Sequence, residues 1–425
     1  MTHHAHLAAL DAADPLAPLR SQFHLPLHHG APQVYLCGNS LGLQPKATRA
    51  ALEQELDDWA RLGVEGHFHA RHSWYETHLE LRDGLARLAG AKPTEVAAMG
   101  SLTSNLHMAL TSFYRPTSSR FKVLMEAEMF PSDRYAMASH IELHGLTREQ
   151  ALIELEGDAR GLISTDRIIE AIRAAGQGLA LVLWSGVNYY SGQRYDLDAI
   201  AEAAREVGAR VGFDLAHAMG NVPLTLHETG PDFAVWCTYK YLNSGPGGVG
   251  GLFVHERHHA DRSLHRLAGW WGNDPATRFT MPRTFVPQHS VDAWQVSNAP
   301  VLQIASLRAS LGLFESVSLE AMREKSLRMG TELRALLHSR LGDRVALLTP
   351  EAESERGCQL SVRVGEAARR VCDQLLARGV VCDFRSPDVV RAAPVPLYNS
   401  FADLGRFVDA LEAIYHEQPW EKPVC

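Results

Sequence analysis

Short apolar runs alternate with amphipathic stretches through the middle of the chain. Residues 179–184 form a continuous apolar run, as expected of a strand that is buried on both faces. Residues 197–207 then carry apolar positions at helical spacing. This alternation predicts an α/β fold with a mostly parallel central sheet covered by helices. Further strands are predicted over residues 122–125, 209–213, 233–238 and 252–255.

The two ends of the chain have a different pattern. The first 45 residues contain five prolines, which predicts an irregular, loop-like segment. We expect a segment over residues 1–60 that packs with the small domain, a large α/β domain over 61–304 and a small α+β domain over 305–425. Helices are predicted over 47–62, 75–88, 302–341 and 366–378, and short strands over 359–364 and 380–384.

Composition narrows the class of protein. The 425 residues are 46% hydrophobic, which is enough for a sizeable core. Lys and Arg total 41 against 49 Asp and Glu, so no basic stripe predicts nucleic-acid binding. The first residues lack the charge and apolar run of a signal peptide. The longest apolar run is far shorter than the ~20 residues that cross a bilayer, so we expect no membrane partner.

Cysteine and histidine usage argues against disulfides and metals. The six cysteines form no C-x-x-C pair, which predicts a protein of the reducing cytoplasm. The 22 histidines make a metal worth considering, but no H-E-x-x-H motif is present. The adjacent histidine pairs at 28–29 and 258–259 would direct their side chains apart. We therefore predict no metal site.

Two residues at predicted strand ends carry the candidate chemistry. Asp214 follows one predicted strand and Lys240 follows the next, 26 residues later, so both side chains can reach one crevice. Pyridoxal phosphate (PLP) enzymes need this pair, because a lysine amine forms a Schiff base with the cofactor and a carboxylate keeps its ring nitrogen protonated. Alone, either residue has an ordinary explanation as a loop lysine or a helix cap. The pair, followed by the glycine-rich run 245–251, favours a PLP site.

A phosphate site is predicted at residues 101–107. This stretch contains two serines and a threonine and precedes a helical segment. Hydroxyls and amide N–H groups at a helix N-terminus bind phosphate well. An ordinary serine cap at a helix start explains the same residues equally well.

At this point the motifs match a known family. The chain resembles the kynureninase family over nearly its whole length. The matching motifs are GNSLGLQP (38–45), LTxNLH (102–107), FPSD (130–133), SGV (185–187), SGQ (191–193), GFDLAH (212–217), YKYLN (239–243), GW (269–270), TRF (277–279), SNxP (297–300) and RxxPVPLYNS (391–400).

The resemblance implies a fold-type-I PLP-dependent, transferase-like enzyme that forms a homodimer with shared active sites. It implies hydrolysis of the Cβ–Cγ bond of L-kynurenine to anthranilate and L-alanine. We expect 3-hydroxy-L-kynurenine to be accepted as well, giving 3-hydroxyanthranilate. Tryptophan (kynurenine) catabolism and pyridine nucleotide (NAD) biosynthesis are both compatible with this reaction.

The resemblance also assigns roles to single residues. Lys240 corresponds to the Schiff-base lysine, Asp214 to the partner of the pyridine nitrogen and Arg391 to the group that binds the substrate α-carboxylate. Tyr239 is either an acid–base group or only a phosphate ligand. His67 and Asn298 are expected beside the substrate ring. The expected cofactor contacts are Leu102, Thr103, Phe130, Pro131, Ser132, Asp133, Ser185, Asp214, His217, Tyr239, Lys240, Trp270 and Asn298, with Trp270 and Asn298 expected from the partner subunit.

Two alternatives belong to other classes of function. Another fold-type-I PLP enzyme, such as a class V aminotransferase or a cysteine desulfurase, would share the Asp–Lys pair. A desulfurase would also need a reactive cysteine on a mobile loop, whereas Cys237 falls on a predicted buried strand. A non-catalytic protein that retains only the fold would be expected to lack Lys240 or Asp214.

Overall fold

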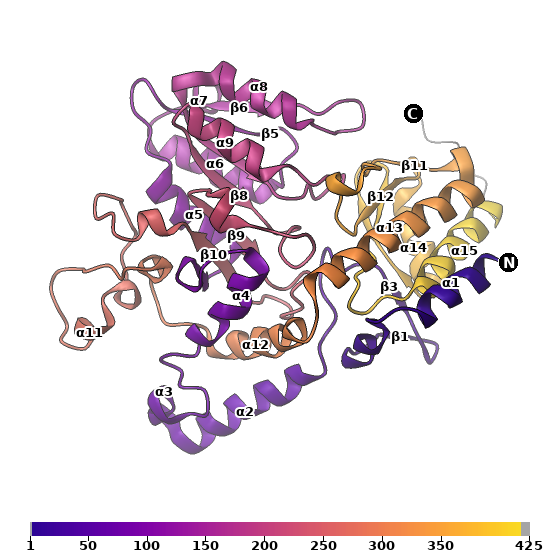
Figure 1. The fold of residues 1–425 in the computed structure, drawn as a ribbon, viewed down its shortest axis with the longest axis horizontal. Helices are drawn as coiled ribbons and strands as arrows, with labels where there is room; N and C mark the ends of the chain where they lie inside the picture. The colour runs from indigo at the N-terminus through magenta and orange to yellow at the C-terminus, as the bar shows by residue number, and fades with distance from the viewer. Residues whose placement is uncertain (1, 418–425) are drawn as a thin grey trace.

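The large lobe is built on a seven-stranded sheet. A computed structural model describes residues 2–417 as two lobes joined by long helices (Figure 1). The strand order of the large sheet is β4-β10-β9-β8-β7-β5-β6. Strands β9 through β6 run parallel, while β10 pairs antiparallel with both β9 and β4. The strands are β4 (Val96–Ala98), β5 (Lys122–Glu126), β6 (Leu152–Leu155), β7 (Leu179–Ser185), β8 (Arg210–Asp214), β9 (Phe233–Cys237) and β10 (Gly250–Val254).

Helices cover both faces of this sheet, because successive side chains of a buried strand point to opposite sides. In β7, Leu183 packs with the helices of one face and Trp184 with those of the other. The first face is covered by α5 (Leu102–Phe113) and α6 (Pro131–Leu143). The other face is covered by α4 (Arg82–Ala89), α8 (Thr165–Ala175), α9 (Leu197–Glu206) and α12 (Val301–Glu315).

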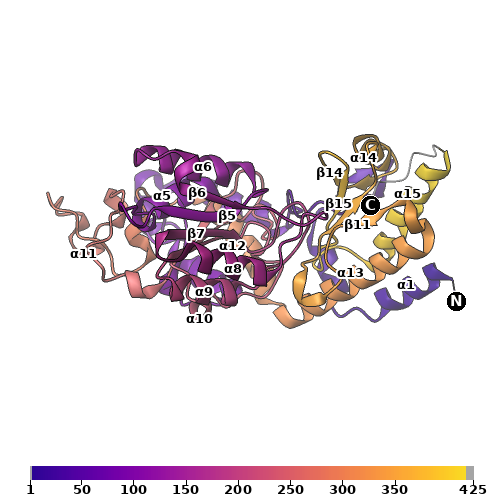
Figure 2. The same ribbon diagram turned by 90° about the horizontal axis from the view of Figure 1, so that it is seen from above.

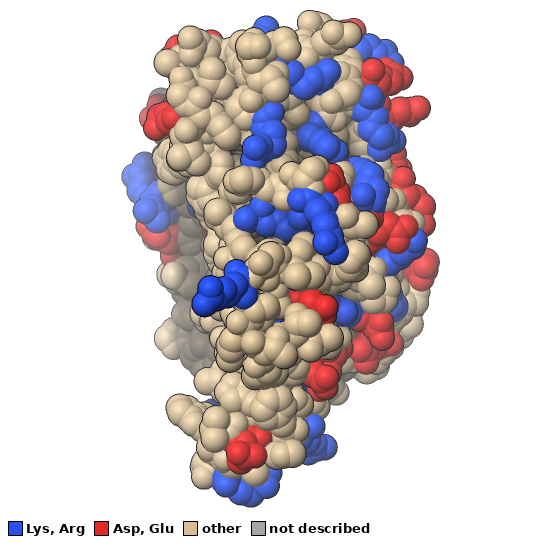
Figure 3. Space-filling model, turned by 90° about the vertical axis from the view of Figure 1, so that its left-hand side faces the viewer, with Lys and Arg blue, Asp and Glu red and all other residues tan. Residues whose placement is uncertain are grey.

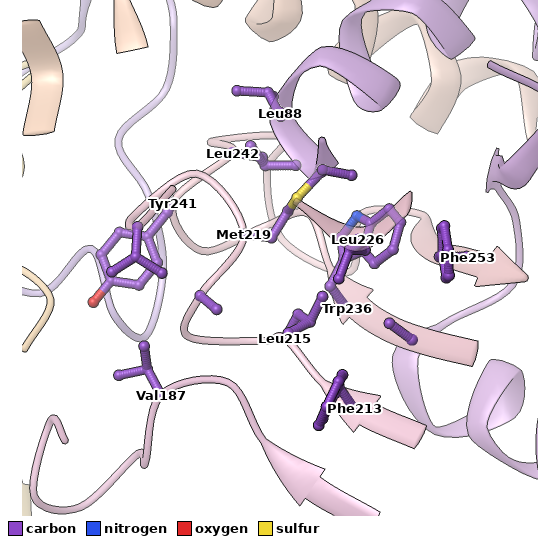
Figure 4. Close-up of a cluster of buried hydrophobic side chains, with 14 of the residues drawn as sticks. Leu88, Val187, Phe213, Leu215, Met219, Leu226, Trp236, Tyr241, Leu242 and Phe253 are labelled. Carbon is purple, nitrogen blue, oxygen red and sulfur yellow. The ribbon is translucent and has the colours of Figure 1, made fainter. Parts of the chain in front are cut away.

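Figure 4 shows part of the second face, where large side chains fill the space behind strands β8 and β9. Phe213, Trp236 and Phe253 come from three neighbouring strands, and each is fully buried. Met219 and Leu242, on the loops that follow β8 and β9, join the same cluster. This packing anchors the loops that carry the candidate chemistry.

The small lobe has its own sheet and its own apolar core. The sheet order is β11-β12-β15-β14, and all pairs are antiparallel. Helix α1 lies along this lobe in both views (Figures 1 and 2), and β3 from the N-terminal segment pairs with β13. The elements of this lobe are α1 (His3–Ala12), β3 (Val34–Tyr35), α13 (Leu319–Leu341), β11 (Ala346–Leu347), β12 (Leu360–Arg363), α14 (Ala368–Ala377), β13 (Val380–Val381), β14 (Asp383–Arg385), β15 (Val389–Ala392) and α15 (Phe401–Glu417).

The N-terminal segment contacts both lobes. Leu7 and Leu10 of α1 join the core of the small lobe, whereas Leu16 and Phe23 join that of the large lobe. Helix α2 (Ala47–Leu62) packs on α12. The remaining short elements are β1 (Leu27–His28), β2 (Ala31–Pro32), α3 (Gly66–His69), α7 (Arg148–Ala151), α10 (Leu226–Thr229) and α11 (Pro275–Arg278).

Several sequence-based expectations about elements need correction. The N-terminal region is not all loop, since Thr2 caps helix α1 by accepting a hydrogen bond from the Ala5 amide. The expected helix over 302–341 is two helices, because Ser318 caps a new helix after a break. Helix α4 begins at Arg82 rather than at residue 75. Strands β4 and β6 were not predicted, as runs of three and four residues carry little periodic signal.

The surface bears mixed charge. On the face drawn in Figure 3, Lys and Arg side chains occur in small groups beside acidic ones, and uncharged residues cover most of the area. Within residues 2–417, every helix is too short or too polar to span a bilayer.

Candidate active site

A cavity of about 390 Å³ lies where the parallel strands of the large sheet end. Strand β7 ends at Ser185 and strand β8 at Asp214, and the loop after β9 supplies Tyr239 and Lys240. Ligands of open α/β sheets bind at this edge. The cavity is lined by Asn39, Ser40, Leu102, Thr103, Phe130, Ser132, Asp133, Ser185, Val187, Tyr189, Asp214, Ala216, His217, Tyr239, Lys240, Arg385 and Arg391.

Lys240 projects into this cavity from a loop that is held on both sides. Thr238 donates to the carbonyl of Val249 and fixes the two ends of the loop together. The amine nitrogen Nζ of Lys240 lies 3.1 Å from Nε2 of His217 and 5.9 Å from the centre of the Phe130 ring. The amine therefore lies between an aromatic face and an imidazole.

The N-terminal segment crosses directly over the lysine loop. The amide of Gly42 donates to the carbonyl of Tyr239 at 2.8 Å. A Cβ atom at position 42 would lie 2.3 Å from the carbonyl oxygen of Lys240, so only glycine fits there. This close approach places Asn39 and Ser40 in the cavity wall.

Two buried carboxylates face the same space. Asp214 accepts a hydrogen bond from the Ala216 amide at 2.8 Å. Burial raises its pKa, and the charge of Lys240 opposes that rise. Burial also raises the pKa of Asp133 well above its usual value, and the neighbouring Asp214 adds to the effect. Neither oxygen of Asp133 accepts a hydrogen bond from an N–H or hydroxyl group of the described residues, and its protonated carboxyl group can donate to Asp214.

His217 completes this group. Burial lowers its pKa well below the usual value, and the charges of Lys240 and Arg391 lower it further. The imidazole is therefore neutral near pH 7 and can accept a hydrogen bond from the Lys240 amine. Its second ring nitrogen, Nδ1, is buried with no partner in the part of the chain that the structure describes.

Hydroxyl groups gather where helices α5 and α6 begin. Thr103, in the first turn of α5, makes a hydrogen bond of 2.7 Å with Ser132 in the first turn of α6. Ser101 caps α5 through the Ser104 amide. Free amides at a helix start and nearby hydroxyls suit an anionic group such as phosphate.

The small lobe contributes two arginines. Arg391 donates from Nε to Asp383 at 2.6 Å and from Nη1 to the carbonyl of Tyr189 at 2.6 Å. Its Nη2 donates to Asp383 and to Ser40. Arg385 donates to Asp383 at 3.1 Å. Burial alone would raise the pKa of Asp383, but its hydrogen bond and charge interaction with Arg391 hold that pKa below the usual value.

Four expected site residues lie outside this cavity. Pro131 is the first residue of α6 and does not line the space. The Trp270 indole donates to the carbonyl of Arg278, His67 lies edge-on against Trp74, and Asn298 is exposed. The roles of Trp270 and Asn298 in the active site of a second subunit stay predictions, as does that of His67.

Six lining residues were not assigned in advance. Asn39, Ser40 and Val187 lie inside motifs that were recognised, so the signal was present but carried no role. Ala216 likewise lies inside a recognised motif, GFDLAH (212–217), but was given no role. Tyr189, on the loop after β7, and Arg385, at the end of β14, reach the cavity only through the tertiary fold, which the linear pattern does not indicate.

Two groups of metal-binding residue types occur within residues 2–417, and neither lines the cavity. One consists of His3, His4 and Asp409 near the N-terminus. The other consists of Glu95, His227 and His255, but these two imidazoles stack with only 18° between their planes. Both nitrogens of His255 already make hydrogen bonds, since Nε2 donates to the carbonyl of His227 and Nδ1 accepts from the amide of Arg257, so this group is explained without a metal.

Solved structures with the same fold include cysteine desulfurases and a C-DES mutant with glycine covalently linked to its PLP cofactor. A cysteine desulfurase from Escherichia coli matches 95% of this chain and 98% of its own, with a TM-score of 0.77 and 17% identity. The apo cysteine desulfurase from Thermococcus onnurineus NA1 matches with a TM-score of 0.75, also at 17% identity, over 91% of this chain and 95% of its own. These matches confirm the expected fold class.

Sequence relatives identify the family. Residues 322–411 match the model of the kynureninase C-terminal domain. The kynureninase of Stenotrophomonas maltophilia is 52% identical over 96% of this chain and 97% of its own length. That of Xanthomonas euvesicatoria pv. vesicatoria is 53% identical with the same coverage. At this identity over nearly the whole length, the chain belongs to the kynureninase family.

Proposed function

We propose that this protein is a kynureninase, a PLP-dependent hydrolase that cleaves the Cβ–Cγ bond of L-kynurenine to give anthranilate and L-alanine. Identity above 50% over nearly the full length of curated kynureninases carries this proposal. The cavity supports it, since Lys240 and Asp214 meet there as the chemistry requires.

The residues of the cavity fit PLP. Asp133 and His217 leave buried polar atoms without partners, and such atoms usually mark a place where another group binds. Lys240 would hold the cofactor aldehyde, Asp214 its ring nitrogen, Phe130 its ring face, and Thr103 and Ser132 its phosphate. The bound cofactor acts as an electron sink for charge that develops on the substrate.

Lys240 is the group that moves protons at the substrate Cα. With the cofactor and substrate bound, a free Lys240 amine would stay within the cavity beside His217. Because His217 is buried and neutral, it does not compete for the proton. Lys240 can therefore take the Cα proton and return it, as a general base and acid.

Tyr239 is the candidate acid–base group at the substrate carbonyl. Burial raises its pKa above the usual value, so it is a protonated phenol at neutral pH and can donate a proton. A protonated Tyr239 would assist the addition of water by donating a proton to the substrate carbonyl, rather than by removing a proton from the water. A phenol that only binds the phosphate is the rival role, and it would show little change in rate on Tyr239→Phe.

Arg391 is the proposed partner of the substrate carboxylate. Its Nε–Nη2 edge already binds Asp383. The edge that remains for a carboxylate is Nη1–Nη2, whose donors now face Tyr189 and Ser40. A planar fork that is fixed on one side presents its other side in a defined orientation. Arg385 lines the same cavity and adds positive charge there.

We further propose a homodimer of the cytoplasm with shared active sites. Phe68, Trp270 and Phe279 form an aromatic patch whose rings contact one another, and Phe279 is 55% exposed. An exposed apolar patch of this kind is typical of a protein interface. Trp270 belongs to this patch, and it is one of the two residues, with Asn298, that we expect to contribute to the active site of the partner subunit. Our proposed division is a segment over residues 1–60, a large domain over 61–304 and a small domain over 305–425. Helix α12 packs in the core of the large lobe, which favours a boundary after Glu315.

Turnover of L-kynurenine by the purified holoenzyme tests the function. We expect anthranilate and L-alanine in equal amounts, with 3-hydroxy-L-kynurenine also cleaved. Release of sulfide from L-cysteine without anthranilate formation would instead favour a desulfurase. Since none of the described cysteines lines the cavity, that outcome is not favoured by the structure.

A further inference from the structure

Glu126 is a buried carboxylate that none of the roles above uses. It is the last residue of β5, beside the end of β7, and its side chain is 1% exposed. Four donors converge on its two oxygens, all from residues 185–195. They are the amide and hydroxyl of Ser185, the side-chain amide of Asn188 at 2.6 Å and the hydroxyl of Tyr195 at 3.1 Å.

The segment that Glu126 holds forms one wall of the cavity. Ser185, Val187 and Tyr189 all line the space. The Tyr189 carbonyl accepts a hydrogen bond from Nη1 of Arg391, the group proposed to bind the substrate carboxylate. Glu126 is thus two hydrogen-bonded steps away from that arginine, through residues 188 and 189.

Asn188 transmits this constraint. Its Nδ2 donates to Glu126, which fixes the orientation of the amide. Its Oδ1 then accepts from the amides of Tyr190 and Ser191, both at 2.9 Å. The backbone on either side of Tyr189 is therefore set by one side chain, and that side chain is oriented by Glu126.

We propose that Glu126 is a positioning residue that sets the placement of Tyr189 against Arg391 and thereby the affinity for the substrate carboxylate. This inference rests on the proposed function only in assigning the carboxylate to Arg391. A carboxylate suits the position because all four partners donate and both of its oxygens accept. Glutamine would turn an NH₂ group toward the donors and disrupt the arrangement.

A pair of substitutions can swap the donor and the acceptor of the Glu126–Asn188 hydrogen bond. In Glu126→Gln, two NH₂ groups face each other, and in Asn188→Asp two carboxylates do. In the double variant the introduced glutamine donates to the introduced aspartate, whose other oxygen still accepts from the backbone amides. We expect the KM for L-kynurenine to rise about tenfold in Glu126→Gln, with a smaller change in kcat. The double variant should return to within about threefold of the wild type.

Binding of L-alanine to the holoenzyme gives a readout that needs no turnover. L-Alanine carries the α-carboxylate but no scissile bond, so its dissociation constant, measured by titration calorimetry, should rise about tenfold in Glu126→Gln and recover in the double variant. Failure of the wild type to cleave L-kynurenine would contradict the proposed function, while the comparison of L-alanine affinities would still test Glu126.

Glu95→Gln is the matched control. Glu95 is equally buried in the same lobe and accepts hydrogen bonds from the Lys92 and Glu256 amides, away from the cavity. It should lower the melting temperature without changing KM or L-alanine affinity. Unchanged L-alanine affinity in Glu126→Gln, or a loss that Asn188→Asp does not restore, overturns the proposal. If Glu126→Gln does not fold, Tyr195→Phe removes one donor instead and should raise KM about threefold, and an unchanged KM there overturns it equally.

Discussion

Each lobe contributes a buried aspartate near the cavity, and the two aspartates differ in their hydrogen bonds and in the direction of their pKa shifts. On the large-lobe side, the buried Asp133 faces only another carboxyl group within residues 2–417, that of Asp214, and burial raises its pKa. On the small-lobe side, Asp383 binds Arg391, Arg385 and Ser40, and its pKa is lowered despite burial. The carboxyl group of Asp133 therefore receives no N–H donor from the described part of the chain, whereas that of Asp383 is fully paired.

This difference between Asp133 and Asp383 indicates which side of the cavity binds the cofactor and which side supports the substrate. Unpaired buried polar atoms are costly, so they persist where a bound group completes them. Saturated polar networks fix geometry before anything binds. We interpret the large-lobe wall as the cofactor side and the small-lobe wall as a rigid support for substrate binding.

Lys240→Ala should abolish the chemistry of the large-lobe wall. Lys240 is proposed both to hold the cofactor and to move the proton, so we expect turnover to fall by about 10²–10⁴-fold or more. Anthranilate fluorescence measures the rate, and the visible absorbance of the holoenzyme reports the lost covalent link. Lys92→Ala, on the surface and paired with Glu256, is the control and should be unaffected. Near-normal anthranilate production by Lys240→Ala would disprove the assignment.

Asp214→Asn should keep the shape of the wall but remove its charge. The ring nitrogen of the cofactor would lose its anionic partner, and we expect kcat to fall about a hundredfold. Steady-state kinetics on L-kynurenine measure this effect. A wild-type rate in Asp214→Asn together with a large loss in Asp133→Asn would transfer the role to Asp133.

Arg391→Lys should weaken the substrate side without touching the cofactor. An ammonium cannot bind Asp383 and a carboxylate as a planar fork does, so we expect KM to rise about tenfold. The cofactor absorbance should stay as in the wild type. Arg385→Lys provides the comparison, because Arg385 contacts Asp383 by a single hydrogen bond. If only that variant loses affinity, Arg385 is the carboxylate site.

The two aspartates should give opposite pH dependences in cofactor-free protein. The raised pKa of Asp133 contributes stability that is fully present below about pH 3.8 and is lost as pH rises. The lowered pKa of Asp383 contributes stability that is present above about pH 3.8 and is lost as pH falls. Asp133→Asn should therefore gain melting temperature relative to wild type as pH rises.

Melting curves between about pH 3 and pH 8 test this contrast, with differences of roughly 2 °C expected. Asp383→Asn should be less stable than wild type at neutral pH and approach it in acid. Parallel pH profiles for the two variants would contradict the distinction between Asp133, which lacks an N–H donor among the described residues, and Asp383, which is fully paired.

The smallest effect concerns the substrate ring. We predict that, in a dimer, His67 and Asn298 form hydrogen bonds with the ring hydroxyl of 3-hydroxy-L-kynurenine and so allow this substrate to bind. Replacing both, by His67→Trp and Asn298→Thr, should change the ratio of kcat/KM for the two substrates by a few-fold to about tenfold. An unchanged ratio would remove these residues from the pocket and leave the PLP site intact.

The amino-acid sequence was enough to predict the large sheet and the meeting of Asp214 with Lys240 at its edge. Helix α2 was predicted with its observed bounds, and the buried strand at 179–184 was found to within one residue. Asp214 and Lys240 were found because parallel strands end at one edge, so spacing along the chain predicts neighbours in space. Motif recognition extended this to most of the wall, including Asp133 and His217.

Only the tertiary structure decided the parts that depend on contacts between distant segments. Arg391 and Asp383 belong to adjacent strands of the small lobe, and they meet Ser40 and Tyr189 only when the N-terminal segment and the loop after β7 fold against them. Glu126 gave no signal in the sequence, because a glutamate at a strand end is usually solvated. Its burial and its four donors arise from the packing of β5 beside β7, which periodicity along one strand does not encode.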